Sequence, residues 1–332
     1  MNLNLKIITV LSSLLLLSIL FSSYYQNLNG QNQKSIVAPK LNESVSTGAI
    51  YKNLSNDLQL VQNTSHKLKV VSSFFPIGEF VKKIGGNLID SSLLIPVGIE
   101  PHDFEPTINQ IQNVISADVL VYNGLGMENW IDKISAPHKI DASAGLNVLY
   151  LDKNNKTIDP HVWLDPDLAK KEVENIRDGL IKIDPYNRDY YTNNTRHFLN
   201  ELDSLDREIR TDLMSCKKKD FISFHNAFSY FAKRYGLNQH SISSTPEAEI
   251  TPQQLIEIIN TAKGLHLNII YSEELIDPRS ASVVAQEIPD GKVLVLSPTE
   301  GLTKAEQDSG IGYLDKMQEN VKTLMQGLEC RL

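Results

Sequence analysis

This chain has few cysteines and no excess of positive charge. Its 332 residues include 2 cysteines, and 32 Lys and Arg stand against 40 Asp and Glu, for a net charge of −8. A general nucleic-acid-binding protein would show a basic face, so this charge argues against that class. Neither cysteine lies near the N-terminus, so we expect no lipid-modified cysteine anchor there.

A hydrophobic run of membrane-spanning length is also missing near the N-terminus. The uncharged stretch from Ile7 to Phe21 has the length of a signal-peptide core and is short for a membrane span. No small-x-small cleavage pattern follows it, so residues 1–21 are predicted to be either a signal peptide or an uncleaved membrane anchor. Both alternatives place the folded protein outside the cytoplasm, secreted or tethered at a cell surface or in a periplasm-like space.

The next segment, residues 22–66, has no apolar periodicity and is rich in Asn, Ser, Gln and Thr. This composition predicts a flexible tether. In an exported chain the two cysteines, Cys216 and Cys330, can form a disulfide or remain free thiols, and the sequence leaves both alternatives open.

Strands and helices alternate through most of the remaining chain. Buried-strand patterns such as "LKVVSSFF" and "DVLVYNG" are separated by helical patterns such as "TINQIQNVISA", and the alternation resumes with the strand "DFISFH". Alternation of this kind predicts parallel sheets covered by helices. We therefore expect two Rossmann-like α/β lobes, formed by residues 67–185 and 217–332.

The segment between these lobes lacks both Pro and Gly. Leu202, Leu205 and Ile209 recur there at helical spacing, and nothing in residues 187–215 interrupts the pattern. A single helix of this length would be about 43 Å long. The sequence therefore predicts one rigid helix, within residues 186–216, as the link between the lobes.

Three of the eight histidines have settings that indicate a ligand site. His102, in "IPVGIEPHDFEPT", lies just past a predicted strand, and His225 ends the strand "DFISFH". Ligand sites in open α/β sheets lie beyond the carboxyl ends of strands. His161 lies in "DPHVWLDP", where two prolines make the backbone rigid and non-helical. Because His102 and His225 belong to different predicted lobes, we expect a site in the cleft between the lobes.

Five motifs occur in the order found in a known family. They are "PHDFEPT", "DPHVWLDP", "SFHNAFSYFAKRYGL", "TPEAEITPQQL" and "GYLDKMQENV". Through them, residues 68–328 resemble the metal-binding lipoproteins and periplasmic proteins that supply zinc or manganese to ABC importers. The resemblance implies two α/β lobes joined by one long helix, with a divalent cation held between them. It also implies an extracytoplasmic solute-binding protein, acting as a monomer, whose partners are an ABC permease and its ATPase.

The resemblance further implies four metal ligands, which are His102, His161, His225 and a carboxylate near the last predicted strand. In "LVLSPTEGLT" that carboxylate corresponds to Glu300, as in zinc-binding members with "SPLE"-like sequences. Manganese-binding members generally carry Glu where this chain has His225, and Asp where it has Ser297. The alternative for Glu300 is a solvated loop carboxylate, with water as the fourth ligand.

The chemistry of this ligand set favours zinc as the bound and transported ion. Three neutral imidazoles and one carboxylate make a four-coordinate site that Zn²⁺ accepts, whereas Mn²⁺ is usually bound by more oxygen ligands. Cu²⁺ remains an alternative ion for this site, because nitrogen ligands bind Cu²⁺ more tightly than Zn²⁺. Trp163 is predicted to pack in the core. Four acidic residues are predicted to orient the imidazoles: Asp103, Asp159, Asp165 and Glu249.

Other functions remain as alternatives. A zinc hydrolase would use three histidines and an open fourth position, but the chain has no H-E-x-x-H motif and Glu300 would close the site. We therefore expect no enzymatic activity. A surface adhesin with a structural metal, or a manganese-binding member of the same family, would keep the same fold. Residues 123–160 contain no histidine-rich insertion, so the accessory metal loop of some zinc-binding members is absent.

Overall fold

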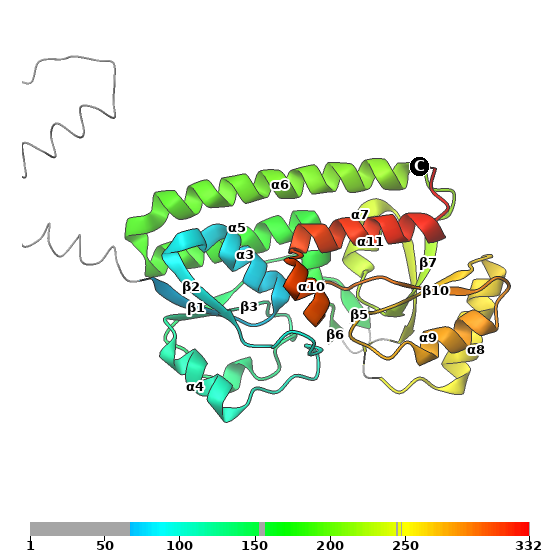
Figure 1. Cartoon of the computed structure of the whole chain (residues 1–332), viewed down its shortest axis with the longest axis horizontal. Helices are drawn as coiled ribbons and strands as arrows, with labels where there is room; N and C mark the ends of the chain where they lie inside the picture. Colours follow the sequence, from blue (N-terminus) through cyan, green and yellow to red (C-terminus); the bar gives the residue numbers. More distant parts are fainter. Residues whose placement is uncertain (1–66, 153–156, 244, 247, 332) are drawn as a thin grey trace, which may run out of the picture. The chain divides into compact units, whose positions relative to one another are not determined.

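The computed structural model describes residues 67–152, 157–243, 245–246 and 248–331 (Figure 1). The predicted signal peptide or anchor at residues 1–21 and the predicted tether at residues 22–66 lie outside this part of the chain. Among the helices that are described, none is both long and apolar enough to cross a membrane.

The first lobe is built on a four-stranded parallel sheet with strand order β2-β1-β3-β4. Its strands are β1 (Leu68–Ser72), β2 (Ile89–Leu93), β3 (Val119–Tyr122) and β4 (Lys139–Asp141), and its helices are α3 (Phe75–Gly85), α4 (Ile108–Ser116) and α5 (Pro166–Ile183). Alternate residues of β1 face opposite sides. Val70 packs in one apolar cluster with Phe80 of α3, whereas Val71 packs in another with Val114 of α4. Helices therefore cover both faces of the sheet.

The second lobe repeats this plan with strand order β10-β9-β7-β8, again all parallel. Its strands are β7 (Asp220–His225), β8 (Asn238–Ser243), β9 (Ile269–Ser272) and β10 (Lys292–Val295). Its helices are α7 (Ser229–Tyr235), α8 (Pro252–Gly264), α9 (Arg279–Gln286), α10 (Lys304–Ser309) and α11 (Tyr313–Gly327). The two parallel sheets confirm the predicted fold class.

A two-stranded antiparallel ladder, which the sequence does not predict, leads into the "DPHVWLDP" segment. In it, β5 (Tyr150–Asp152) pairs with β6 (Thr157–Ile158). The hydroxyl of Tyr230, in α7, donates to the carbonyl of Asp159 (2.9 Å) and accepts the N–H of Leu149 (2.8 Å). The second lobe therefore contacts the segment on which His161 is mounted.

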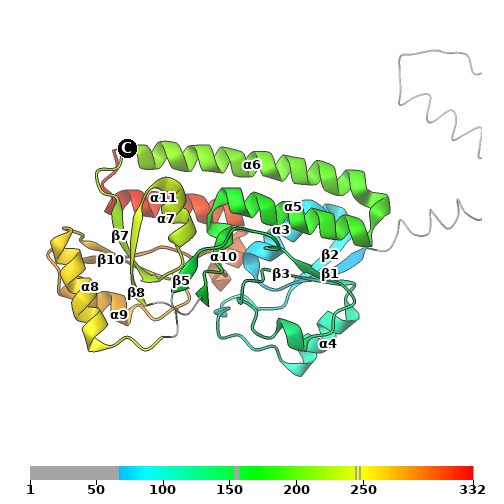
Figure 2. The same ribbon diagram turned by 180° about the vertical axis from the view of Figure 1, so that it is seen from behind.

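A single helix, α6 (Arg188–Met214), links the two lobes. Its 27 residues span about 40 Å, close to the predicted length. Figures 1 and 2 show α6 running along both lobes, with α5 beneath one half and α11 beneath the other. The buried face of α6 has the three- and four-residue spacing of an amphipathic helix and consists of Tyr191, Thr195, Phe198, Leu202, Leu205, Ile209 and Leu213.

One apolar cluster extends through both lobes beneath α6. The ring of Phe80 in α3 lies 5.8 Å from that of Phe198 in α6 and 4.9 Å from that of Tyr313 in α11, between centroids. The same cluster includes Phe221 and Phe228 of the second lobe. Because α11 packs against both α3 and α6, the C-terminal part of the chain is tied to the first lobe. This shared core opposes wide separation of the lobes.

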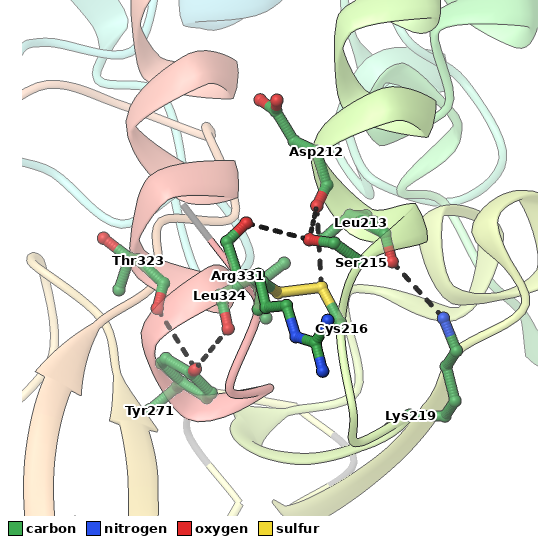
Figure 3. Close-up of a disulfide and its surroundings, with 10 residues drawn as sticks. Asp212, Leu213, Ser215, Cys216, Lys219, Tyr271, Thr323, Leu324 and Arg331 are labelled. Carbon is green, nitrogen blue, oxygen red and sulfur yellow. Dashed lines mark hydrogen bonds between the residues drawn. A yellow bond between two sulfur atoms is a disulfide. The ribbon is translucent and has the colours of Figure 1, made fainter.

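Cys216 and Cys330 form a disulfide, which decides between the alternatives that the sequence leaves open (Figure 3). The bond joins residues 114 positions apart, just past the ends of α6 and α11. Beside it, the Ser215 hydroxyl donates to the Arg331 carbonyl (3.0 Å), and the Tyr271 hydroxyl of β9 donates to two backbone carbonyls of α11 (3.2 and 3.3 Å). The C-terminal helix is thus fastened to the linking helix and to the second sheet.

Candidate metal centre

His102 lies in the loop between β2 and α4. Its backbone N–H donates to the Glu100 carboxylate (2.9 Å). The loop ends in a capping box, in which the Thr107 side chain accepts the N–H of Gln110 and the Gln110 side chain accepts the N–H of Thr107. The side chain of His102 is 15% exposed, so it forms the solvent-facing side of the site.

His161 is held by Asp159, two residues earlier in the "DPHVWLDP" segment. One carboxylate oxygen of Asp159 accepts both the backbone N–H of His161 (3.1 Å) and the ring Nδ1–H (2.7 Å). Nδ1 is thereby occupied, and Nε2 is left to face a ligand. The second Asp-Pro pair starts α5, because Asp165 caps that helix by accepting the N–H of Asp167 (2.8 Å). The first Asp-Pro pair therefore holds His161, and the second starts the helix that follows.

His225 is the last residue of β7, and Glu273 holds it in the same way. Glu273 lies just past the end of β9, the neighbouring strand, and is 5% exposed. Its Oε1 accepts the backbone N–H of His225 (3.2 Å) and the ring Nδ1–H (2.6 Å). Glu273 is not among the acidic residues that the sequence predicts to orient the imidazoles. The available signal was its position beyond the carboxyl end of a predicted strand, the same argument that identified His102 and His225.

Glu300 lies in the loop between β10 and α10. Its side chain is 3% exposed, so the alternative of a solvated loop carboxylate is wrong. The loop enters α10 through a second capping box, formed by Thr303 and Glu306. A carboxylate buried to this degree needs partners of opposite charge or hydrogen-bond donors.

These four side chains converge. Glu300 Oε1 lies 3.0 Å from His161 Nε2, 3.3 Å from His102 Nε2 and 3.7 Å from His225 Nε2. His161 Nε2 lies 3.3 Å from His102 Nε2 and 3.2 Å from His225 Nε2. A tetrahedral zinc ion with bonds of ~2.0–2.1 Å has its ligand atoms about 3.3 Å apart. The four ligand atoms, all within 4.8 Å of one another, therefore have the spacing to hold one small tetrahedral cation.

Burial and charge act in opposite directions on the pKa of these groups. Burial alone would lower the pKa of His161, but the hydrogen bonds and charges of Asp159 and Glu300 outweigh it and raise that pKa to about 10. Burial would raise the pKa of Glu300, but the imidazoles around it, His102 first, hold it well below its usual range. The carboxylates thus stabilise positive charge at the centre of the cluster, whether it is carried by a proton or by a metal ion.

The other residues predicted around the site divide into those that contact it and those that do not. Asp159 orients an imidazole as predicted, but Asp165 does not, because it caps α5 and pairs with Arg234 (3.2 Å). Within the described part of the chain, Asp103 and Glu249 make no hydrogen bond to the three imidazoles. Trp163 is fully buried in the main apolar cluster, as predicted.

Comparison with known proteins gives concordant matches. A family model described as zinc-uptake complex component A, periplasmic, matches residues 70–327. The chain is 38% identical over 281 residues to the high-affinity zinc uptake system protein ZnuA of Bacillus subtilis, a match that covers 79% of this chain and 88% of that protein. It is 35% identical over 286 residues to the zinc-binding protein AdcA of Streptococcus pyogenes, covering 78% of this chain and 55% of AdcA. The chain thus spans about half the length of AdcA.

A solved structure shows the same relationship. The Zn(II)-bound ZnuA-like domain of Streptococcus pneumoniae AdcA superposes with a TM-score of 0.71 at 34% sequence identity. The superposition covers 80% of this chain and 100% of that domain.

Proposed function

Because the chain belongs to the family of periplasmic zinc-uptake components, we propose that it is the extracytoplasmic solute-binding protein of an ABC importer. In this proposal it captures Zn²⁺ outside the cytoplasm and delivers the ion to a membrane permease that works with an ATPase. Zn²⁺ is then the cargo rather than a resident cofactor. The zinc named for the ZnuA and AdcA relatives supports this choice of ion.

The observation that carries the proposal is the convergence of three imidazole nitrogens and one carboxylate oxygen. We propose that His102, His161, His225 and Glu300 are the zinc ligands. Three nitrogens and a single oxygen favour Zn²⁺ over Mn²⁺, which prefers more oxygen ligands. Asp159 accepts the Nδ1–H of His161, and Glu273 accepts the Nδ1–H of His225. The Nε2 atoms of these two rings are therefore left to face the ion.

The remaining parts of the chain have roles in the same proposal. Residues 67–185 and 217–332 act as the two lobes, residues 186–216 link them, and residues 1–66 export and tether the protein. The chain acts as a monomer. It catalyses no reaction, because Glu300 takes the fourth position that a hydrolytic zinc site keeps open for water.

Metal competition tests this proposal. Protein purified without added metal is analysed for bound metal and then titrated with Zn²⁺, Mn²⁺ and Cu²⁺ in competition. We expect one zinc ion per chain, retained in an excess of Mn²⁺. Preference for Mn²⁺ or Cu²⁺ would contradict zinc as the cargo, and hydrolysis of esters or peptides by the zinc-loaded protein would contradict a pure transport role.

Zinc binding should release a proton from His161 even at pH 8, where a free imidazole carries almost none. The pKa of His161 in the metal-free protein is raised to about 10, so the ring is protonated below that pH and zinc must displace the proton. Zinc affinity should therefore rise about tenfold per pH unit between pH 7 and 9. Calorimetry in buffers of different ionisation enthalpy counts the released protons.

The Asp159→Asn variant is the control for this measurement. It removes the negative charge that helps to hold the proton on His161, so fewer protons should be released at pH 8. If the unchanged protein releases no proton at pH 8, the account of the His161 environment is wrong.

Zinc binding should change the shape of the protein only slightly. Binding proteins with flexible hinges close widely around their ligand, whereas a continuous helix and a core shared by both lobes resist bending. We expect a change in the radius of gyration of at most about 1 Å, by solution scattering of the apo and zinc-loaded full chain. A large decrease on adding zinc would show that α6 bends or that the shared core separates.

A further inference from the structure

We propose that Trp163 is a positioning residue, which holds Glu300 against the three histidines through a hydrogen bond from its indole N–H. This inference rests on the proposed function, because it concerns how the zinc site keeps its carboxylate ligand. It gives a specific role to a side chain that the sequence predicts only to pack in the core.

The indole of Trp163 is held firmly by its surroundings. The side chain is fully buried, and its ring meets Phe74 edge-on at 5.0 Å between centroids and lies 5.3 Å from the ring of His161. The backbone carbonyl of Trp163 accepts the hydroxyl of Tyr313 (2.5 Å). A ring fixed in this way directs its one N–H along a single line.

That N–H reaches a loop far away in the sequence. It donates to the carbonyl of Pro298 at 2.8 Å, across 135 residues, and Pro298 precedes Glu300 by two positions. The bond therefore joins the segment that carries His161 to the loop that carries Glu300. Although Glu300 follows a strand of the second lobe, its loop is fastened to the first lobe.

The backbone between Pro298 and Glu300 has a conformation that its surroundings must hold in place. Thr299 is fully buried and has a φ of +60°, a left-handed conformation that is unfavourable for a residue with a Cβ atom. Such a conformation persists only where the surroundings hold it. The N–H of Thr299 donates to the hydroxyl of Ser297 (3.0 Å), and the Trp163 bond holds the carbonyl of the residue between them.

On the C-terminal side of Glu300, a second hydrogen bond joins the loop to the first lobe. The N–H of Gly98, in the segment that leads to His102, donates to the carbonyl of Leu302 (2.9 Å). Loss of the Trp163 bond should therefore leave the loop folded but free to shift on the Pro298 side. Metal ligands must stay within about 0.5 Å of their working geometry, so even a small shift of Glu300 weakens its hold on zinc.

The test compares zinc dissociation rates in the full chain, measured by stopped flow with a chromogenic chelator. Trp163→Phe should speed zinc loss about tenfold, equivalent to ~1.4 kcal/mol, and Glu300→Ala at least as much. The double variant should lose zinc no faster than Glu300→Ala alone, because without Glu300 nothing remains for Trp163 to position. A residue that merely supports the core would not show this dependence on Glu300.

Two further proteins separate the hydrogen bond from the bulk of the ring. Replacing Trp163 with β-(3-benzothienyl)alanine keeps the bicyclic ring and substitutes sulfur for the N–H, and it should speed zinc loss as Trp163→Phe does. Tyr191→Phe is the control for loss of a buried hydrogen bond away from the site. Tyr191 of α6 is fully buried and its hydroxyl donates to Asp184 (2.8 Å), so zinc loss in this variant should change less than about twofold.

Normal dissociation in the sulfur variant, or independent and multiplying effects in the double variant, would overturn the role of the hydrogen bond. Failure of the proposed function has a different signature. The unchanged protein would then hold no zinc tightly, and that result would overturn both proposals before any variant is compared.

Discussion

Replacing His161 by alanine is expected to weaken zinc binding by at least about 100-fold. Four-ligand zinc sites bind with about 10–16 kcal/mol, or roughly 3 kcal/mol per ligand, and each 1.4 kcal/mol is a factor of ten. His161 is 1% exposed, and its Nε2 lies 3.0–3.3 Å from the ligand atoms of the other three side chains. The change also leaves Asp159 as a buried carboxylate without its partner. Competition with a chelator of known affinity measures the loss.

Similar losses are expected for His102→Ala and His225→Ala. His138 and His266 are exposed and provide matched controls, so zinc affinity in His138→Ala and His266→Ala should stay within about twofold of the unchanged protein. Near-normal affinity in His161→Ala would rule out the proposed ligand set. It would also remove the explanation for the rigid "DPHVWLDP" segment.

Removal of the disulfide is expected to cost a large part of the stability while leaving zinc binding almost unchanged. Cys216 and Cys330 are 114 positions apart, and closing a loop of this size stabilises a fold by about 2–5 kcal/mol, mainly by restricting the unfolded chain. For a protein of this size the Cys216→Ser/Cys330→Ser variant should melt roughly 5–15 °C lower. The bond lies near Asp220 at the start of β7, whereas His225 ends that strand, so zinc affinity should change less than about threefold.

Thermal unfolding followed by circular dichroism tests this expectation. A reductant should lower the melting temperature of the unchanged protein toward that of the double serine variant and should leave the variant itself unaffected. Equal melting temperatures for the two proteins without reductant would show that the bond contributes nothing to stability. A zinc affinity lowered as much as in His161→Ala would show that the ends of α6 and α11 affect the site.

The three histidines of the site could be predicted from the sequence close to each of them. His102 and His225 lie where predicted strands end, and His161 lies between two Asp-Pro pairs, so each has a signal within a few residues of itself. Glu273 also follows a predicted strand, but nothing near it in the sequence shows that its carboxylate orients His225. It faces His225 only because β9 lies beside β7 in the sheet, and the order of strands is not written in either strand alone. The predicted role of Asp165 is wrong for a related reason, since its partner Arg234 comes from α7 of the other lobe.

The sequence alone predicts the alternation of strands and helices, the continuous linking helix and the three histidines at the centre of the site. These features depend on periodicity and on the placement of Pro and Gly, which act on neighbouring residues. The packing of the folded chain is needed to show that Glu300 is buried, that Glu273 orients His225 and that Cys216 bonds to Cys330. Each of those outcomes joins residues far apart in the chain, so it follows from the order of the strands and the packing of the lobes around α6.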